Sequence, residues 1–273
     1  MTSVIKITDL NVLQKAKKED LITNPFPFII IKDCLPENIY QELSNRYPSR
    51  QTIFQHDEKN HKQIQNNTRY QISANKALTD NNIDPLWKAF IQYHCSQHFY
   101  QQVIELFGDE IIKRFPHLIQ ETKQHPKDWK VGMRWNDTKS PMVSDCQIGI
   151  NSPVIETTSV KGPHCDNKVE LFAGLLYMRL PEDNSEGGSL EIYRHPDGSF
   201  KMFDHPQWGK NTIDDPKLEK IMDIPYDKNV FVIFLNSRDS IHGVSPRKPT
   251  QFDRRLVNII GEIRNLKQGL WKK

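Results

Sequence analysis

The sequence predicts a mainly β fold with supporting α-helices, in which the second half of the chain forms a β-sandwich or jelly roll. Three observations lead to this prediction. Eight short segments with strand-like composition, separated by turn residues, follow residue 143. Apolar residues at helical spacing occur mainly in the first half. The second half does not alternate strands with helices, as a parallel sheet would require.

Length and composition indicate an ordinary globular chain. The 273 residues are 37% hydrophobic and 26% charged, and we expect a single domain over residues 1–273. Within it, residues 1–140 are expected to form a mostly helical support and lid region, and residues 141–264 the β core. The net charge of +3 is spread along the chain, which argues against a nucleic-acid partner.

The N-terminal sequence lacks the basic and apolar pattern of a secretory signal, and no apolar run approaches the roughly 18 residues that span a bilayer. We therefore expect a cytoplasmic protein without a membrane partner. The four cysteines are far apart and form no CxxC pair, so reduced, buried thiols are expected rather than a zinc knuckle or disulfides. Nothing in the sequence predicts an oligomeric state.

The first half begins with a predicted buried strand at 25–35 and a helix at 36–48. The polar stretch 51–82 shows little periodicity and is predicted to be a long surface loop, a candidate lid. An Asp-Pro pair then starts a long helix predicted over 84–108.

Two histidines of this long helix, His94 and His98, are four residues apart and could share one face. The metalloprotease pattern requires glutamate directly after the first histidine, and Cys95 stands there instead. We therefore interpret His94 and His98 as packing or surface residues.

The predicted strands of the second half are bounded by turn residues and are short enough for a sandwich or jelly roll. They span 146–154, 159–166, 170–180, 188–194, 220–226, 229–236, 241–246 and 254–264.

The second of these strands carries a His-x-Asp motif, His164 and Asp166, whose side chains would project from the same face of a strand. His242 lies just past a later strand that a jelly roll would bring alongside. Two imidazoles and one carboxylate leave three metal positions open, as in non-haem Fe(II) oxygenases. In the alternative interpretation, His164 and His242 are ordinary turn residues.

Several motifs together resemble the iron- and 2-oxoglutarate-dependent dioxygenases of the prolyl 4-hydroxylase-like group. They are HCDN (164–167), a GG-x-L turn (187–190), a strand ending FLN (234–236), IHGV (241–244) and RRLVN (254–258). The resemblance covers roughly residues 140–264, and PFPFIIIKDCLPENIYQEL (25–43) is more weakly similar to the opening of many members.

The resemblance implies a cupin-like double-stranded β-helix, a form of jelly roll. In this fold His164, Asp166 and His242 would be both the metal ligands and the catalytic centre. The implied cofactor is Fe(II), the co-substrate is 2-oxoglutarate, and ascorbate is a further expected reductant. The reaction would hydroxylate an unactivated C–H bond and release succinate and CO2. Because Asp166 is retained, hydroxylation is favoured over halogenation.

The family also uses an arginine or lysine on the last core strand to bind the distal carboxylate of 2-oxoglutarate, for which a guanidinium is well suited. Matching RRLVNII (254–260) to the family's strand pattern implies that Arg254 faces inward together with Leu256 and Asn258. Arg255 and Arg247 remain alternatives. Arg254 and Arg255 could also be solvated charges at a strand end.

A tyrosine on the strand after His-x-Asp often binds the oxoacid in this family. The best alignment places Leu176 at that position and Tyr177 on the opposite face, which makes Tyr177 a doubtful ligand. Tyr193 is the other phenol within reach, and we include it among the co-substrate candidates.

The substrate class is left open between a small molecule, a carrier-bound metabolite and a peptidyl side chain. Two long segments, 51–82 and 195–220, are candidates for covering the site. The suggested lining residues are Arg69 and Tyr70 of the first segment, Trp208 of the second, and Trp135, which lies between them in the sequence. The alternative is that these four residues occupy ordinary surface or core positions.

Two rival classes remain, a non-catalytic jelly-roll binding protein and a cupin-type metalloenzyme. A binding protein descended from an enzyme would usually have lost a ligand, and a cupin would typically carry a histidine-rich cluster. A hydrolase is disfavoured because no nucleophile motif is present.

Overall fold

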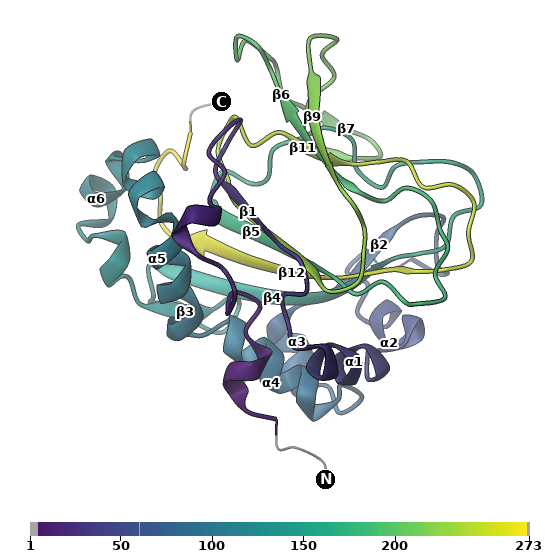
Figure 1. Cartoon of the computed structure of the whole chain (residues 1–273). Helices are drawn as coiled ribbons and strands as arrows, with labels where there is room; N and C mark the ends of the chain where they lie inside the picture. The colour runs from purple at the N-terminus through teal and green to yellow at the C-terminus, as the bar shows by residue number, and fades with distance from the viewer. Residues whose placement is uncertain (1–4, 60, 272–273) are drawn as a thin grey trace.

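The computed structural model describes residues 5–59 and 61–271, and its strands form a large sheet that faces a smaller one (Figure 1). The large sheet has seven strands in the order β1-β10-β5-β12-β4-β2, with β3 paired to β4, and the small sheet has the order β11-β6-β9. Strands β7 and β8 form a separate pair. The two sheets face each other without closing into a barrel. This architecture, with helices beside it, confirms the predicted α+β fold class.

The strands of the large sheet are β1 (Phe28–Ile31), β2 (Arg69–Ile72), β3 (Val131–Met133), β4 (Met142–Asn151), β5 (Glu170–Tyr177), β10 (Val230–Leu235) and β12 (Arg254–Ile263). Those of the small sheet are β6 (Leu190–Arg194), β9 (Glu219–Ile224) and β11 (His242–Val244), and the separate pair is β7 (Phe203–His205) with β8 (Gly209–Thr212). The α-helices are α1 (Glu37–Asn45), α2 (Arg50–Phe54), α3 (Ala74–Thr79), α4 (Pro85–His94), α5 (Gln97–Arg114) and α6 (His117–Thr122). Short 3-10 helices lie at Ile7–Leu10, Lys18–Asp20 and Pro126–Asp128.

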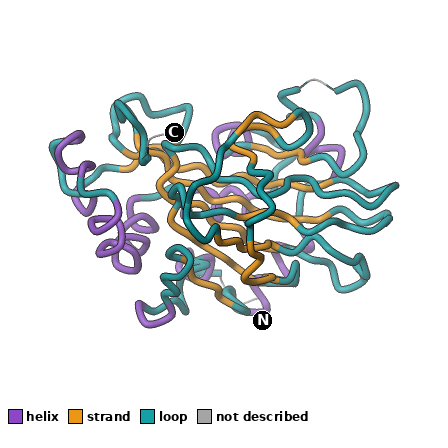
Figure 2. Tube along the Cα trace, turned by 90° about the horizontal axis from the view of Figure 1, so that it is seen from above, coloured by secondary structure: helices purple, strands orange, loops and turns teal. Residues whose placement is uncertain are grey.

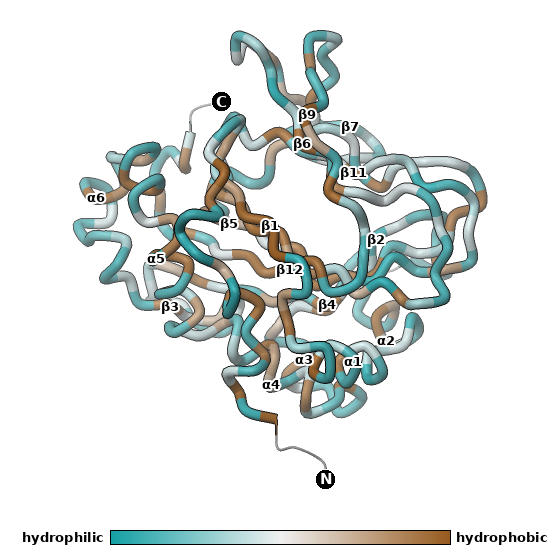
Figure 3. Tube along the Cα trace, in the orientation of Figure 1, coloured by the Kyte–Doolittle hydropathy of each residue, from teal (hydrophilic) through white to brown (hydrophobic). Residues whose placement is uncertain are grey.

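Alternating side chains of the large sheet belong to two different cores. Along β10, Val232 and Phe234 pack between the two sheets, whereas Phe231 and Ile233 pack in the core shared with the helices. Both faces of β10 are therefore buried, which explains its continuous apolar sequence. Figure 3 shows hydrophobic residues along β1, β5 and β12 in the same way.

The helices pack on the outer face of the large sheet. Figure 1 shows α1, α3 and α4 below its strands, and Figure 2 shows a further group of helices beside the strands at the left of the view. Trp87 and Phe90 of α4 and Phe99 and Phe107 of α5 are buried in one core with Ile148 of β4. Burying each such aromatic side chain contributes about 1.5–3 kcal/mol. This packing supports the large sheet from outside and leaves its inner face to form the site.

The long helix predicted over 84–108 is in fact two helices, and the second extends to Arg114. The chain breaks at Cys95 and Ser96, where the Ser96 hydroxyl donates to the Tyr93 carbonyl (2.6 Å) and accepts from the Phe99 amide (3.3 Å). A serine that satisfies backbone groups in this way caps a new helix. The apolar spacing did not reveal the break because both helices pack on one core.

Two further predictions of secondary structure were wrong. The stretch 51–82 is not a single surface loop, because it contains most of α2, all of α3, and strand β2, which pairs with β4. Its polar residues Arg69 and Gln71 face a cavity rather than bulk solvent, which hid the strand pattern. The segment 159–166, predicted as a strand, is irregular and forms only isolated bridges, such as that between His164 and His242.

The histidines of α4 and α5 behave as predicted. His94 is buried, its Nδ1 donates to the Phe90 carbonyl (2.8 Å), and its Nε2 accepts weakly from the Val12 amide (3.4 Å). His98 is exposed. All four cysteines are buried free thiols, as expected. Within residues 5–59 and 61–271, no helix has both the length and the apolarity needed to cross a membrane.

Candidate metal centre and active site

His164, Asp166 and His242 meet between the two sheets in a cavity of about 70 Å³. His242 opens strand β11, and His164 lies beside it in the irregular segment that precedes β5. The two residues exchange backbone hydrogen bonds, with the His164 amide donating to the His242 carbonyl (2.9 Å) and the reverse bond at 3.0 Å. Backbone pairing therefore brings together two histidines that are remote in sequence.

Both imidazoles are oriented by carbonyl groups of their own loops. Nδ1 of His164 lies 2.8 Å from the Gly162 carbonyl, and Nδ1 of His242 lies 2.8 Å from the Ser240 carbonyl. A carbonyl can only accept, so in both rings Nδ1 carries the proton. Nε2 is left with a free lone pair, and a carbonyl behind each ring is the usual support of a metal-binding histidine.

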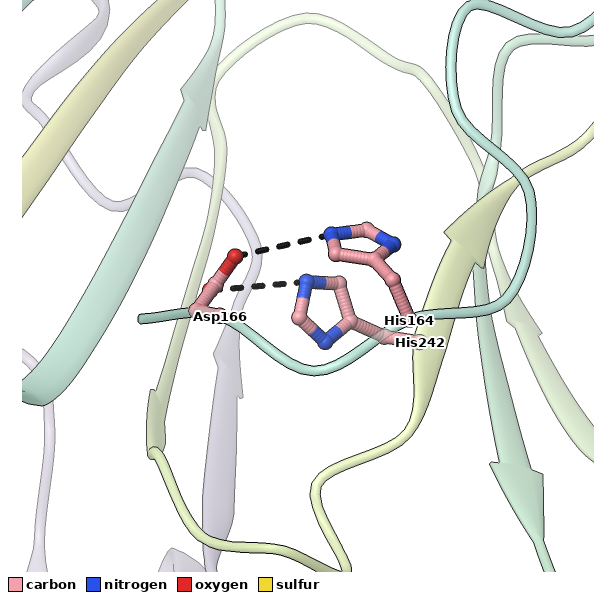
Figure 4. A group of neighbouring side chains, drawn as sticks. All are labelled: His164, Asp166 and His242. Carbon is pink, nitrogen blue, oxygen red and sulfur yellow. Dashed lines mark ion pairs between the residues drawn. The ribbon is translucent and has the colours of Figure 1, made fainter. Parts of the chain in front are cut away.

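The two Nε2 atoms point toward the two oxygens of Asp166 (Figure 4). His164 Nε2 lies 3.5 Å from Oδ1, and His242 Nε2 lies 3.5 Å from Oδ2. One ligand atom from each residue lies within 4.8 Å of the others. Donor atoms that share an ion at about 2.1 Å lie about 3 Å apart at right angles, so little adjustment is needed.

Burial sets the protonation states of the group. It lowers the pKa of His164 to about 3 and also lowers the pKa of His242, so both rings are neutral at pH 7. Burial opposes ionisation of Asp166, but its pKa is lowered below the ordinary value, with the Lys161 ammonium favouring the carboxylate. The three side chains are thus in the forms that bind a cation.

This donor set fits Fe(II). Two neutral imidazoles and one carboxylate on one side of an ion are typical of non-haem iron oxygenases. The three predicted ligands come together, although not through the pleat of a regular strand. Asp166 reaches the histidines from an irregular segment, where the Asn211 side chain donates to its backbone carbonyl (3.1 Å).

Arg254 lies at the other end of the inner face of the large sheet, as the strand pattern predicted. Its side chain is fully buried, with Nε donating to the Gly188 carbonyl (2.6 Å) and Nη1 to Asn151 Oδ1 (3.0 Å). The guanidinium carbon lies 4.9 Å from the ring centre of Tyr177 and 5.2 Å from that of Tyr226. Two aromatic rings therefore enclose this cation.

Four buried donor atoms around Arg254 have no hydrogen-bond partner within residues 5–59 and 61–271. They are Nη2 of Arg254, Nδ2 of Asn151, Nε of Arg69 and the hydroxyl of Tyr177. Arg69, Asn151 and Arg254 lie side by side on β2, β4 and β12. Unpaired buried donors are costly, and four together indicate that an anionic acceptor belongs there.

The two other candidate arginines differ in position. Arg255 points to the opposite face of β12, where its guanidinium stacks over Tyr47 (5.0 Å). Arg247 is buried beside Arg254, next to Gly188, and its Nη1 and Nη2 donate to the Ser152 (3.0 Å) and Phe252 (2.8 Å) carbonyls.

Tyr193 is also directed away from the metal ligands. Its hydroxyl donates to Glu191 (2.6 Å), and its ring packs with a small cluster outside the cavity. Tyr177, which the alignment placed on the wrong face, lies in the core between the sheets, whereas Leu176 packs toward the helices. The alignment was therefore one residue out of register at this point.

A larger cavity of about 590 Å³ adjoins the one that holds the three ligands. The two share the wall residues Arg69, Lys161, Asp166, Glu170 and Asn258. A substrate in the larger cavity would therefore lie next to the metal position.

Two of the four suggested lining residues belong to this wall, namely Arg69 and Trp208. Tyr70 is instead buried in the helix-side core, where its hydroxyl accepts from the Gln65 amide (2.8 Å). Trp135 is 66% exposed and stacks against Arg134. Lys161 was not among the suggestions, because a lysine beside a Gly-Pro turn carries no signal of a cavity.

No family model matches the chain, and no curated protein matches it in sequence. Solved structures match it in fold. The chain is similar to a prolyl 4-hydroxylase from Phytophthora capsici, with 13% identity and a TM-score of 0.51 over 97% of this chain and 68% of that one. This likeness confirms the fold expected from the resemblance, that of the prolyl 4-hydroxylases.

Two further matches have lower TM-scores. One is a prolyl hydroxylase from Trichoplax adhaerens in complex with a peptide fragment of hypoxia inducible factor, with 12% identity and a TM-score of 0.43 over 86% of this chain and 83% of that one. The other is a viral collagen prolyl hydroxylase from Paramecium Bursaria Chlorella virus-1 in its 2OG complex, with 12% identity and a TM-score of 0.41 over 86% and 95%.

Proposed function

We propose that this protein is an Fe(II)- and 2-oxoglutarate-dependent oxygenase that hydroxylates an unactivated C–H bond. The observation that carries the proposal is the pairing of two sites on one inner surface. One is a cluster of two neutral imidazoles and a carboxylate, and the other is a buried arginine among unpaired donors. A metal ion and a small dianionic oxoacid would satisfy both.

His164, Asp166 and His242 would hold the ferrous ion, and Arg254 with Tyr177 would bind the distal carboxylate of 2-oxoglutarate. When bound, the iron would allow O2 to oxidise a C–H bond, with one oxygen atom going to the new hydroxyl group and the other to succinate as 2-oxoglutarate loses CO2. The protein's own part is to fix both partners and to exclude water.

The groups that surround the metal ligands and Arg254 have defined roles in this scheme. The Gly162 and Ser240 carbonyls hold the two imidazole protons on Nδ1, so that Nε2 faces the ion. Tyr177 and Tyr226 shield the Arg254 guanidinium from solvent, which strengthens its interaction with a carboxylate. The adjoining cavity leaves room for the substrate beside the metal position.

An anaerobic titration tests the proposal. Protein mixed with Fe(II) and 2-oxoglutarate should develop a weak visible charge-transfer band, which neither component gives alone with the protein. Admission of O2 should then yield succinate. A non-catalytic binding protein would give neither signal, and a cupin-type metalloenzyme would bind iron without requiring 2-oxoglutarate.

A further inference from the structure

The larger cavity is lined by two cations, Lys161 and Arg69, that form no ion pair with any residue in the described part of the chain. Lys161 lines both cavities, and no carboxylate of the described residues lies within ion-pair distance of its ammonium. Arg69 likewise makes no ion pair, and its buried Nε has no hydrogen-bond partner. Burial lowers the pKa of Lys161 and that of Arg69, the latter to about 10, whereas the nearby Asp166 carboxylate favours the charged form of both. Desolvated cations without a counter-ion are costly to keep.

The other charged residues that line the larger cavity do not neutralise the positive charge of Lys161 and Arg69. Arg134 is neutralised by Glu262 at 2.8 Å, and Asp166 is assigned to the metal. Lys168 and Lys210 add two further cations to the same wall. The remaining acidic group, Glu170, forms no ion pair with any of them in the part of the chain that the structure describes.

The co-substrate does not account for all of these cations. In the proposed function, Arg254 binds the distal carboxylate of 2-oxoglutarate. Arg254 on β12, Asn151 on β4 and Arg69 on β2 are neighbours across the sheet. Arg69 is close enough to both Arg254 and Asp166 for their charges to act on it, whereas Lys161 is influenced by Asp166 and Glu170 and lines the larger cavity. Lys161 therefore faces whatever enters that cavity.

We infer that the substrate is a small acid whose carboxylate or phosphate group pairs with Lys161. An acid long enough to reach Arg69 would pair with that residue as well. This inference rests on the proposed function and names its substrate class. The amides of Gln71, Gln147 and Asn258 line the same wall and can bind polar atoms of the substrate.

The size of the cavity favours a small molecule over an extended peptide. Its volume of about 590 Å³ falls within the range of small-molecule sites, roughly 300–1,000 Å³. The loop between β7 and β8 closes one side, where the Trp208 indole donates to the Ser159 carbonyl (3.3 Å). The indole also packs so tightly on Gly162 that a Cβ there would lie 2.8 Å from it.

The first experiment measures anion binding by the protein already loaded with Fe(II) and 2-oxoglutarate under anaerobic conditions. Sulfate and acetate are titrated at constant ionic strength against chloride, and the melting temperature is recorded. We expect the melting temperature of the native protein to rise to a plateau as the anion is added. In Lys161→Met the affinity for the anion should be at least about tenfold weaker, which corresponds to a loss of about 1.4 kcal/mol of binding free energy. Lys161→Arg should restore binding.

Lys248→Met is the matched control, because Lys248 is exposed and pairs with Glu186 outside the cavity. It should bind the anions as the native protein does. The absence of a saturable effect in the native protein, or equal affinity in Lys161→Met, would overturn the inference. Absence of the charge-transfer band would instead count against the proposed function, so the two failures can be told apart.

The second experiment identifies the kind of acid by succinate formation. Phosphomonoesters are compared with their alcohols, and carboxylic acids with their amides, using native protein and Lys161→Met. Turnover that requires the phosphate or the carboxylate, and that falls in Lys161→Met, supports the inference and names the group. A neutral prolyl peptide that is turned over equally by both proteins contradicts it.

Discussion

Arg254 and Tyr177 lie side by side between the two sheets, with the guanidinium carbon 4.9 Å from the centre of the phenol ring. Each ends in a buried donor atom for which the described residues provide no hydrogen-bond partner. The burial of Tyr177 raises its pKa, with the nearby Arg254 acting in the opposite direction, so the phenol keeps its proton. A protonated phenol and a guanidinium both donate. The pair is therefore built to share one anionic acceptor.

Arg254→Met should raise the concentration of 2-oxoglutarate needed for half-maximal succinate formation by about 10–100-fold. This factor corresponds to the loss of a hydrogen bond to a charged group, which contributes about 1.5–3 kcal/mol. Arg255→Met is the matched control, because its guanidinium lies on the other face of β12. Circular dichroism checks that the first variant still folds. A large effect in Arg255→Met alone would reverse the assignment.

Tyr177→Phe should have opposite effects on stability and on co-substrate binding. Without 2-oxoglutarate, removal of an unpaired buried hydroxyl should raise the free energy of unfolding by about 1 kcal/mol. With 2-oxoglutarate, the lost hydrogen bond should weaken binding about tenfold or more. Denaturation and titration measure the two effects, and Tyr193→Phe should leave co-substrate binding unchanged.

Asp166→Ala should abolish iron-dependent succinate formation and the anaerobic visible band, because two imidazoles alone leave the ion weakly held. The fold should persist, since the backbone pairing of His164 with His242 does not involve the Asp166 side chain. Asp239→Ala removes an exposed carboxylate nearby and serves as the control. Full activity in Asp166→Ala would remove this residue from the site.

His94 should make the stability of the protein depend on pH. Burial lowers the pKa of His94 to about 3, whereas an unfolded histidine takes up a proton below about pH 6.5. Between these values the unfolded state binds more protons, so stability falls with decreasing pH by up to about 1.4 kcal/mol per unit for this group.

Urea denaturation between pH 7 and pH 4.5 measures this slope. His94→Gln should lower stability at pH 7, because its contacts with Phe90 and Val12 change, and should flatten the slope. His98→Gln, on the exposed side of α5, should leave the slope as it is. An unchanged slope in His94→Gln would mean that His94 is protonated in the folded state.

The sequence predicted those parts of the molecule whose patterns are local. The apolar run of β10 follows from local composition, and the two histidines with Asp166 follow from motif spacing. The inward position of Arg254 came from matching its strand to the pattern of the family that the sequence resembles. Tyr177 was assigned to the wrong face because an alignment by motif does not fix the register of an apolar strand, in which both faces are buried.

The features that were missed depend on long-range contacts. Strand β2 has polar residues on its inner face because that face borders a cavity, so its sequence looked like that of a loop. Lys161 gains its position from the bridge that pairs its segment with β11, which no local pattern encodes. The break at Ser96 was hidden because packing on a common core preserved the apolar spacing.

The two backbone hydrogen bonds between His164 and His242 bear on how the protein would tolerate loss of a bound metal ion. The chain itself, rather than an ion, joins these two distant segments, and the rings are already turned toward Asp166 by the carbonyls behind them. An ion held in the proposed site would therefore be able to leave and return while the two segments stay joined, so the apo and metal-bound proteins are expected to share one fold.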